Sequence, residues 1–218
     1  MASSADIVFS GTSDGVIKRS FRISPESHIY EFKNQVKVTA TPVAISPSGD
    51  RRGLYVLENN NSIAHIDGET FSIIKEVEIK GYDATSLSYS VATNELWVGD
   101  KKGLVHILDG NDFSQKSVIE KKHNHAVSVV KSSFDGKFVA SGDAYRYIYV
   151  FDTETKQEVG CYPYHQAKII GLDFNKDSSK LLTTGLDLTV GVADLATKTH
   201  KTVHRPNEKD LTASVFDD

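Results

Sequence analysis

The stretch VASGDAYRYIYVFD, residues 139–152, begins with small residues, continues with alternating apolar side chains and ends on an acid. Related stretches are LLTTGLDLTVGVAD (181–194), LWVGDKKGLVHILD (96–109), LYVLENNNSIAHID (54–67) and VFSGTSDGVIKRSF (8–21). Four of the copies end on an aspartate, and these aspartates are 42 or 43 residues apart: Asp67, Asp109, Asp152 and Asp194. The chain is therefore built from a repeat of about 42 residues.

A period of roughly 40 to 45 residues is typical of the four-stranded blade of a β-propeller. Within each period the side chains alternate with period two, and clusters of turn residues separate the alternating runs. The last complete period predicts strands at 169–174, 181–185, 190–193 and 200–203. The preceding period predicts strands at 127–130, 138–142, 147–151 and 159–162. We therefore expect an all-β propeller of four-stranded antiparallel blades.

We expect residues 1–218 to form a single domain of about five blades. The predicted complete blades span residues 42–83, 84–125, 126–167 and 168–210. A further blade is shared between 211–218 and 7–33, with Leu211 to Phe216 pairing with Ile7 to Phe9, so that the termini close the ring and no sheet edge stays open. The alternative is that these blades are part of a larger ring of about seven blades.

Composition excludes several classes of protein. The 218 residues contain 29 acids and 25 bases, with no long basic run, so a nucleic-acid partner is not expected. No apolar run reaches the roughly 18 residues of a membrane span, and the N-terminus lacks a signal-peptide pattern, so we expect a cytoplasmic protein without membrane contact. Cys161 is the single cysteine, and we interpret it as a reduced strand or core residue.

Several residues resemble the WD40-repeat family, whose blades combine a histidine before the first strand, a hydroxyl in the second, an aspartate in the tight turn and a Trp-Asp pair closing the third. The matching residues are His123 and His165, then Ser10, Ser141 and Thr183, then Asp14 and Asp187. The tryptophan position holds Ser20, Ile66, Leu108, Phe151 and Ala193. We therefore expect the family's hydrogen-bonded tetrad to be complete in no blade, and only the last blade to keep its histidine, hydroxyl and aspartate together.

A narrower resemblance rests on residues 134–159 and 164–187, which are similar to the C-terminal propeller of the actin-interacting protein 1 family. That family carries a Ser-Gly-Asp-Ala stretch followed by an aromatic-His step into a strand. The resemblance implies a non-catalytic propeller of the actin cytoskeleton that acts with cofilin to disassemble actin filaments or restrict their ends. A WD40 scaffold in another assembly is the first alternative, and a propeller hydrolase is the second.

Binding residues are expected in the turns between second and third strands and in the loops between blades, because both emerge on one rim. Tyr145 and Arg146, with Tyr164 in the next loop, are residue types enriched at interface hot spots. Lys101 and Lys102 either meet an acidic partner surface or form a solvated turn. The further candidates for partner binding are His123, His125 and Arg205.

Other residues are expected to be structural. We expect His165 to hydrogen-bond Thr183 and Asp187, Ser141 to occupy the hydroxyl position, and Asp152 and Asp194 to be turn acids. Trp97 is expected between blades. No metal site is expected, because cysteine pairs and metal-ligating histidine spacings are missing from the sequence. We expect no catalytic residues and no cofactor, since nucleophile, phosphate-binding and dinucleotide motifs are missing as well.

Overall fold

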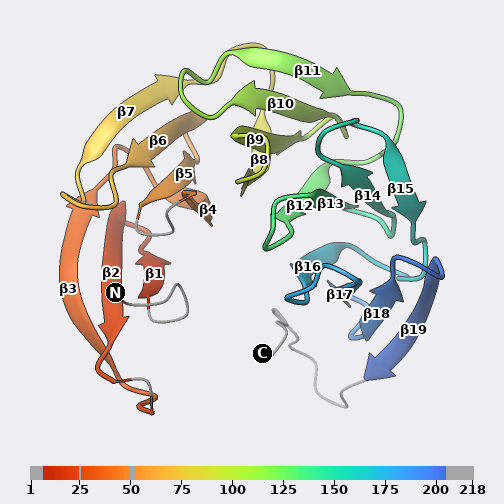
Figure 1. Ribbon diagram of the computed structural model, residues 1–218. Helices are drawn as coiled ribbons and strands as arrows, with labels where there is room; N and C mark the ends of the chain where they lie inside the picture. The colour runs from red at the N-terminus through yellow and green to blue at the C-terminus, as the bar shows by residue number, and fades with distance from the viewer. Residues whose placement is uncertain (1–6, 25, 50–52, 205–218) are drawn as a thin grey trace. The chain divides into compact units, whose positions relative to one another are not determined.

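The computed structural model describes residues 7–24, 26–49 and 53–204. Every regular secondary-structure element in these residues is a β-strand (Figure 1). The strands form five antiparallel sheets, one of three strands and four of four strands, within the described ranges. In each sheet, strands that follow one another in the chain lie side by side. The prediction of an all-β fold made of small antiparallel blades is confirmed.

The chain divides into two compact units, residues 1–81 and 82–218. In the first unit, one sheet contains β1 (Ile7–Gly11), β2 (Val16–Arg22) and β3 (Tyr30–Lys37). The other sheet contains β4 (Pro42–Pro47), β5 (Leu54–Glu58), β6 (Ser62–Ile66) and β7 (Ile73–Glu78). Ile17 from the first sheet and Val56 from the second are both fully buried in one apolar cluster, which holds these two sheets together.

The second unit contains three sheets. The first consists of β8 (Ala84–Ser90), β9 (Glu95–Asp100), β10 (Val105–Asp109) and β11 (Gln115–Ile119). The next consists of β12 (Val127–Ser132), β13 (Phe138–Asp143), β14 (Ile148–Asp152) and β15 (Glu158–Cys161). The last consists of β16 (Ile169–Phe174), β17 (Lys180–Gly185), β18 (Val190–Asp194) and β19 (Thr199–His204). Within this unit, β8, β12 and β16 lie on one side of the sheets and β11, β15 and β19 on the other (Figure 1).

All four four-stranded sheets fall within the predicted blade periods. The predicted strands of the last two sheets match the observed ones to within a residue or two. The shared blade depends on residues 211–216, which lie outside the described residues. The extent of a single domain over residues 1–218 therefore stays a prediction.

Neighbouring sheets of the second unit are joined by a repeated device at a β-bulge. Each first strand has its register shift near its start, as between Ala84 and Ser86 in β8. The hydroxyl of Thr85, inside that bulge, donates to the carbonyl of Val127 on the next sheet at 2.5 Å. Ser128 repeats the contact one sheet later, where it donates to the carbonyl of Ile169 at 2.6 Å. The first two sheets of the unit thus each hold the first strand of the sheet that follows.

Trp97 packs between two sheets, as the sequence suggested. Its side chain is fully buried among residues of β10, β12 and β13, and its ring lies 6.1 Å from that of Phe151 on β14. Burial of so large an aromatic surface makes this contact a major source of inter-sheet stability.

The described residues contain no helix that is long and apolar enough to cross a membrane.

Candidate functional site

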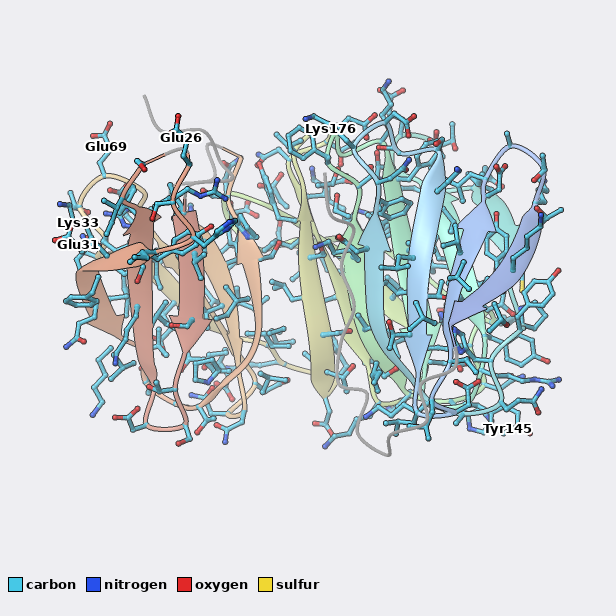
Figure 2. The ribbon with its side chains drawn as sticks, turned by 90° about the horizontal axis from the view of Figure 1, so that it is seen from below. Glu26, Glu31, Lys33, Glu69, Tyr145 and Lys176 are labelled. Carbon is cyan, nitrogen blue, oxygen red and sulfur yellow. The ribbon has the colours of Figure 1, made fainter. Side chains whose placement is uncertain are left out.

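One end of the second unit gathers six segments, which we call the loop face: residues 82–83, 100–104, 120–126, 143–147, 162–168 and 185–189. Backbone hydrogen bonds join them in pairs. Lys101 N–H donates to the carbonyl of Asp83 at 3.0 Å, and Ala144 N–H donates to that of Ala126 at 2.8 Å. Tyr145, on this face, and Lys176, in the turn after β16, lie at opposite ends of the strands (Figure 2). The turns and inter-sheet loops therefore share one rim.

A buried histidine-aspartate pair organises the central part of this face. His123 and Asp143 have fully buried side chains, and His123 Nδ1 lies 3.2 Å from Asp143 Oδ2. His123 Nε2 lies 2.7 Å from Ser141 Oγ. Since a carboxylate only accepts, His123 donates through Nδ1 and accepts the Ser141 hydroxyl proton at Nε2. The expectation that only the last blade combines histidine, hydroxyl and aspartate is therefore wrong.

Asp143 also determines the conformation of the turn that carries the predicted aromatic and cationic candidates. Its Oδ1 accepts the backbone N–H groups of Tyr145, Arg146 and Tyr147 at 3.0, 2.8 and 3.0 Å. Burial alone raises the pKa of Asp143, but the hydrogen bonds from His123 and from this turn outweigh it, so the net shift is downward. Asp143 is thus a carboxylate that positions the turn.

The last sheet contains the predicted histidine network. His165 Nδ1 lies 3.1 Å from Asp187 Oδ1, and its Nε2 lies 2.9 Å from Thr183 Oγ1. Asp187 in turn accepts the backbone N–H of Gln166 at 2.7 Å, which fixes the loop entering β16. Burial raises the pKa of Asp187, but bonds from Thr189, Gln166 and His165 lower it by more.

A fourth side chain that the sequence analysis did not foresee joins this network, while the family's own tetrad stays incomplete because Ala193 occupies the tryptophan position. His200 Nε2 lies 2.9 Å from Thr183 Oγ1. The Thr183 proton is used on His165, so His200 donates to the hydroxyl oxygen. His200 is the cross-strand partner of Ala193, the residue at the tryptophan position. An imidazole N–H on β19 thus supplies the donor that the resemblance assigned to an indole on β18. Desolvation, with His165 nearby, lowers the pKa of His200 to about 4, so this ring is neutral at physiological pH.

The first sheet of the unit contains a different pair that the sequence analysis missed. His106 Nε2, from β10, lies 3.0 Å from Asp100 Oδ2. Asp100 Oδ1 accepts the N–H groups of Lys102 and Leu104, both at 2.8 Å. The ring of Tyr82 stacks on His106 with centroids 3.4 Å apart, and burial raises the pKa of Tyr82 to about 12. The histidine here comes from a strand, so the spacing of the other two could not reveal it.

The structure brings some of the candidate binding residues together and separates others. His125 and Tyr145 are both exposed, and their rings are in contact with centroids 5.1 Å apart. The Arg146 guanidinium lies over Tyr145 at 5.6 Å and over Tyr147 at 5.2 Å. Tyr164 does not join this group through any contact within the described residues. It stacks on His200 instead, with centroids 4.6 Å apart.

The basic turn lies next to the same loops. Gly103 has a positive φ of 87°, and a Cβ placed there would come within 2.6 Å of the His123 carbonyl oxygen and 2.8 Å of that of His125. The turn containing Lys101 and Lys102 therefore packs directly on the histidine loop. Lys101 pairs with Asp83 at 3.3 Å, and both side chains are well exposed. Arg205 lies outside the described residues.

The aspartates that end the third strands are turn acids. Asp152 Oδ1 accepts the N–H of Thr155 at 2.7 Å, and Asp194 Oδ1 accepts that of Thr197 at 2.8 Å. In both, the backbone and hydroxyl hydrogen bonds of the threonine lower the pKa of the carboxyl group. These carboxylates therefore support turns.

Chemistry beyond binding has little support in the described residues. They contain no group of three or more His, Cys, Asp or Glu side chains arranged to hold a metal. Burial raises the pKa of the Cys161 thiol, which disfavours the nucleophilic thiolate. The loop face offers aromatic rings, cations and backbone groups, which are the components of a macromolecular contact.

The comparisons with known proteins agree with the repeat. Residues 115–152 match the family model described as WD domain, G-beta repeat. The 66 kDa stress protein of Physarum polycephalum is 31% identical over 153 residues, covering 69% of this chain and 24% of that protein. Actin-interacting protein 1-2 of Arabidopsis thaliana is 28% identical over 132 residues, covering 59% of this chain and 21% of the relative.

Actin-interacting protein 1 of Drosophila melanogaster is 26% identical over 188 residues, covering 84% of this chain and 30% of the relative. The chain therefore matches less than a third of the length of each of these three relatives. The repeats of this chain are WD40 repeats built as β-propeller blades, and its sequence is similar to that of actin-interacting protein 1.

Proposed function

We propose that this WD40 protein-interaction scaffold binds actin filaments and promotes their disassembly together with cofilin in the cytoplasm. The observation that carries the proposal is the similarity to two proteins named actin-interacting protein 1, which for the Drosophila protein extends over 84% of this chain. This chain covers only a fraction of the length of these relatives, so the activity of the whole relatives is assigned to it here as a proposal.

The loop face is the proposed contact surface. Tyr145 is 49% exposed, and it forms a continuous group with His125 and Arg146. Aromatic and arginine side chains held by buried neighbours lose little conformational entropy on binding, which is why they dominate interface energetics. Asp143 holds this turn from below, so the contact residues are positioned before a partner arrives.

Cosedimentation with filamentous actin, with and without cofilin, tests the proposal. We expect the protein to pellet with filaments and to pellet more when cofilin is present. The double variant Tyr145→Ala, Arg146→Ala is expected to weaken binding by about 1 to 4 kcal/mol without unfolding the chain. Lys176→Ala is the matched control, because Lys176 lies at the opposite end of the strands (Figure 2).

Absence of pelleting under both conditions would remove the actin proposal and favour a WD40 scaffold of a different assembly. Equal binding by the double variant and the wild type would show that the contact lies on another surface of the protein. A hydrolase role predicts turnover in a broad activity screen. The described residues supply no metal-binding cluster for such chemistry, and we expect no turnover.

A further inference from the structure

We infer that the loop face binds an acidic, extended polypeptide segment, and that Arg146 pairs with one of its carboxylates. This inference rests on the proposed role of the loop face in partner binding and adds the chemistry of the partner.

The first argument for an acidic partner is the charge of the loop face. Its six segments contain six cations: Lys101, Lys102, Lys121, Lys122, Arg146 and Lys168. They contain five acids, of which three, Asp100, Asp143 and Asp187, have side chains at most 8% exposed and are bonded to histidines. Only Asp83 and Glu120 remain as outward acids on these segments. The three buried carboxylates keep their charge but cannot be reached by a partner, so the side chains that the face presents to a partner are mainly basic, although the whole chain has a net charge of -4.

Most of these cations are not neutralised within the protein. Lys101 pairs with Asp83, and Lys122 pairs with Glu158 of β15 at 2.6 Å. The structure shows no ion pair for the other four cations with any described residue. A carboxylate-rich segment would supply the missing charges, and the positive potential would also accelerate its approach.

Arg146 is the cation best prepared for one particular contact. Its guanidinium carbon lies 5.6 Å from the ring centroid of Tyr145 and 5.2 Å from that of Tyr147, so the group makes cation–π contacts with both rings. Among the described residues its guanidinium makes one weak hydrogen bond, 3.4 Å from Nη2 to the Tyr147 hydroxyl, so the Nη1 and Nη2 donors remain for a partner. A planar guanidinium with unused donors fits the two oxygens of a carboxylate.

The neighbouring rings favour a polypeptide. The exposed rings of Tyr145 and His125 lie in contact beside the guanidinium. They form an aromatic surface on which the side chains flanking an acidic residue can pack. The residues of this surface come from two loops joined by the Ala144 to Ala126 hydrogen bond, so the surface is continuous across two sheets.

Fluorescence anisotropy with the full chain tests the inference. The probe is a labelled peptide of alternating glutamate and tyrosine, and its glutamine counterpart is the uncharged control. We expect the acidic peptide to bind and the glutamine peptide to bind at least tenfold more weakly. Arg146→Ala should weaken binding about tenfold and Arg146→Lys by a smaller factor, because lysine keeps the charge and loses the planar fork. Lys176→Ala should change it less than twofold.

The inference is overturned if the acidic peptide does not bind, or if Arg146→Ala and Lys176→Ala have equal effects. It is also overturned if a single-stranded RNA of equal charge binds more tightly than the peptide, since the face would then recognise nucleic acid. Peptide binding that depends on Arg146 without filament binding would refute only the actin proposal. Filament binding without peptide binding would refute only this inference.

Discussion

Replacing Asp143 by alanine tests the claim that one buried carboxylate holds the central turn of the loop face. Asp143 has no exposed surface and accepts four hydrogen bonds, three from backbone N–H groups and one from His123. Alanine removes every acceptor and leaves the buried His123 without its charged partner. The same substitution frees the turn that carries Tyr145 and Arg146.

The magnitude follows from the kind of bonds that are lost. Hydrogen bonds to a charged group contribute about 1.5 to 3 kcal/mol each, but they are not additive. The three turn N–H groups can be rehydrated at the surface, whereas His123 cannot. A buried His123 N–H left without an acceptor costs about 1 to 3 kcal/mol, and part of the turn bonding is lost as well, so we expect Asp143→Ala to lower the free energy of unfolding by about 3 kcal/mol.

Asparagine gives a graded comparison. Its carbonyl oxygen can still accept the turn N–H groups, and its amide can donate to His123 Nδ1 if the imidazole changes tautomer and donates to Ser141. We expect Asp143→Asn to cost about 1 to 2 kcal/mol. Asp152→Ala is the matched control at the other end of β13 and β14, and its turn acid should contribute about 1 kcal/mol or less.

Urea unfolding followed by tryptophan fluorescence measures these differences, because the single tryptophan, Trp97, is buried beside Phe151 of the neighbouring sheet, which also contains Asp143. The folded-state pKa of Asp143 is lowered, so its contribution is present above the unfolded pKa of about 3.9 and is lost as pH falls below it. A loss below about 1 kcal/mol for the alanine variant, or no difference in acid sensitivity from wild type, would refute the reasoning.

Three further predictions concern other parts of the second unit. Trp97→Ala should lower the free energy of unfolding by about 3 to 5 kcal/mol through the cavity it leaves, and Trp97→Phe by clearly less, as measured by urea unfolding followed by circular dichroism. Gly103→Ala should cost about 2 kcal/mol, because its Cβ meets two carbonyl oxygens at a positive φ. Gly81→Ala, with a φ of 95° and open space around it, isolates the backbone part of that cost, so equal losses for both variants would contradict the clash. The pKa of His200 is about 4 when folded and about 6.5 when unfolded, so the unfolded state takes up the proton first and stability falls as pH drops through this window. His200→Gln keeps a donor for Thr183 and should be less acid-sensitive than wild type between pH 7 and pH 4.5, and an unchanged pH dependence would disprove this assignment.

Much of the architecture could be predicted from the sequence because it depends on residues that are near one another in the chain. Alternating side chains specify strands, and turn chemistry divides them. The turn aspartates Asp152 and Asp194 each accept a hydrogen bond from the threonine three residues later. Thr183 and Asp187 lie four residues apart, as Ser10 and Asp14 do, and the expected hydrogen bonds between His165 and both residues are present.

Other contacts depend on register and on packing between loops, which residue spacing does not encode. Asp143 follows Ser141 by two residues where Asp187 follows Thr183 by four, so alignment of the repeats hid its role as the partner of His123. His200 reaches the network because β19 pairs with β18 across a bulge that places it opposite Ala193.

The sequence by itself determined the repeat, the strands and the local turns of this protein, because each follows from neighbours within one period. The tertiary structure alone decided that Asp143 supports the turn of Tyr145 and Arg146, and that His125 lies against Tyr145. These residues come from different loops, and only the packing of one sheet on the next brings their side chains within reach of one another.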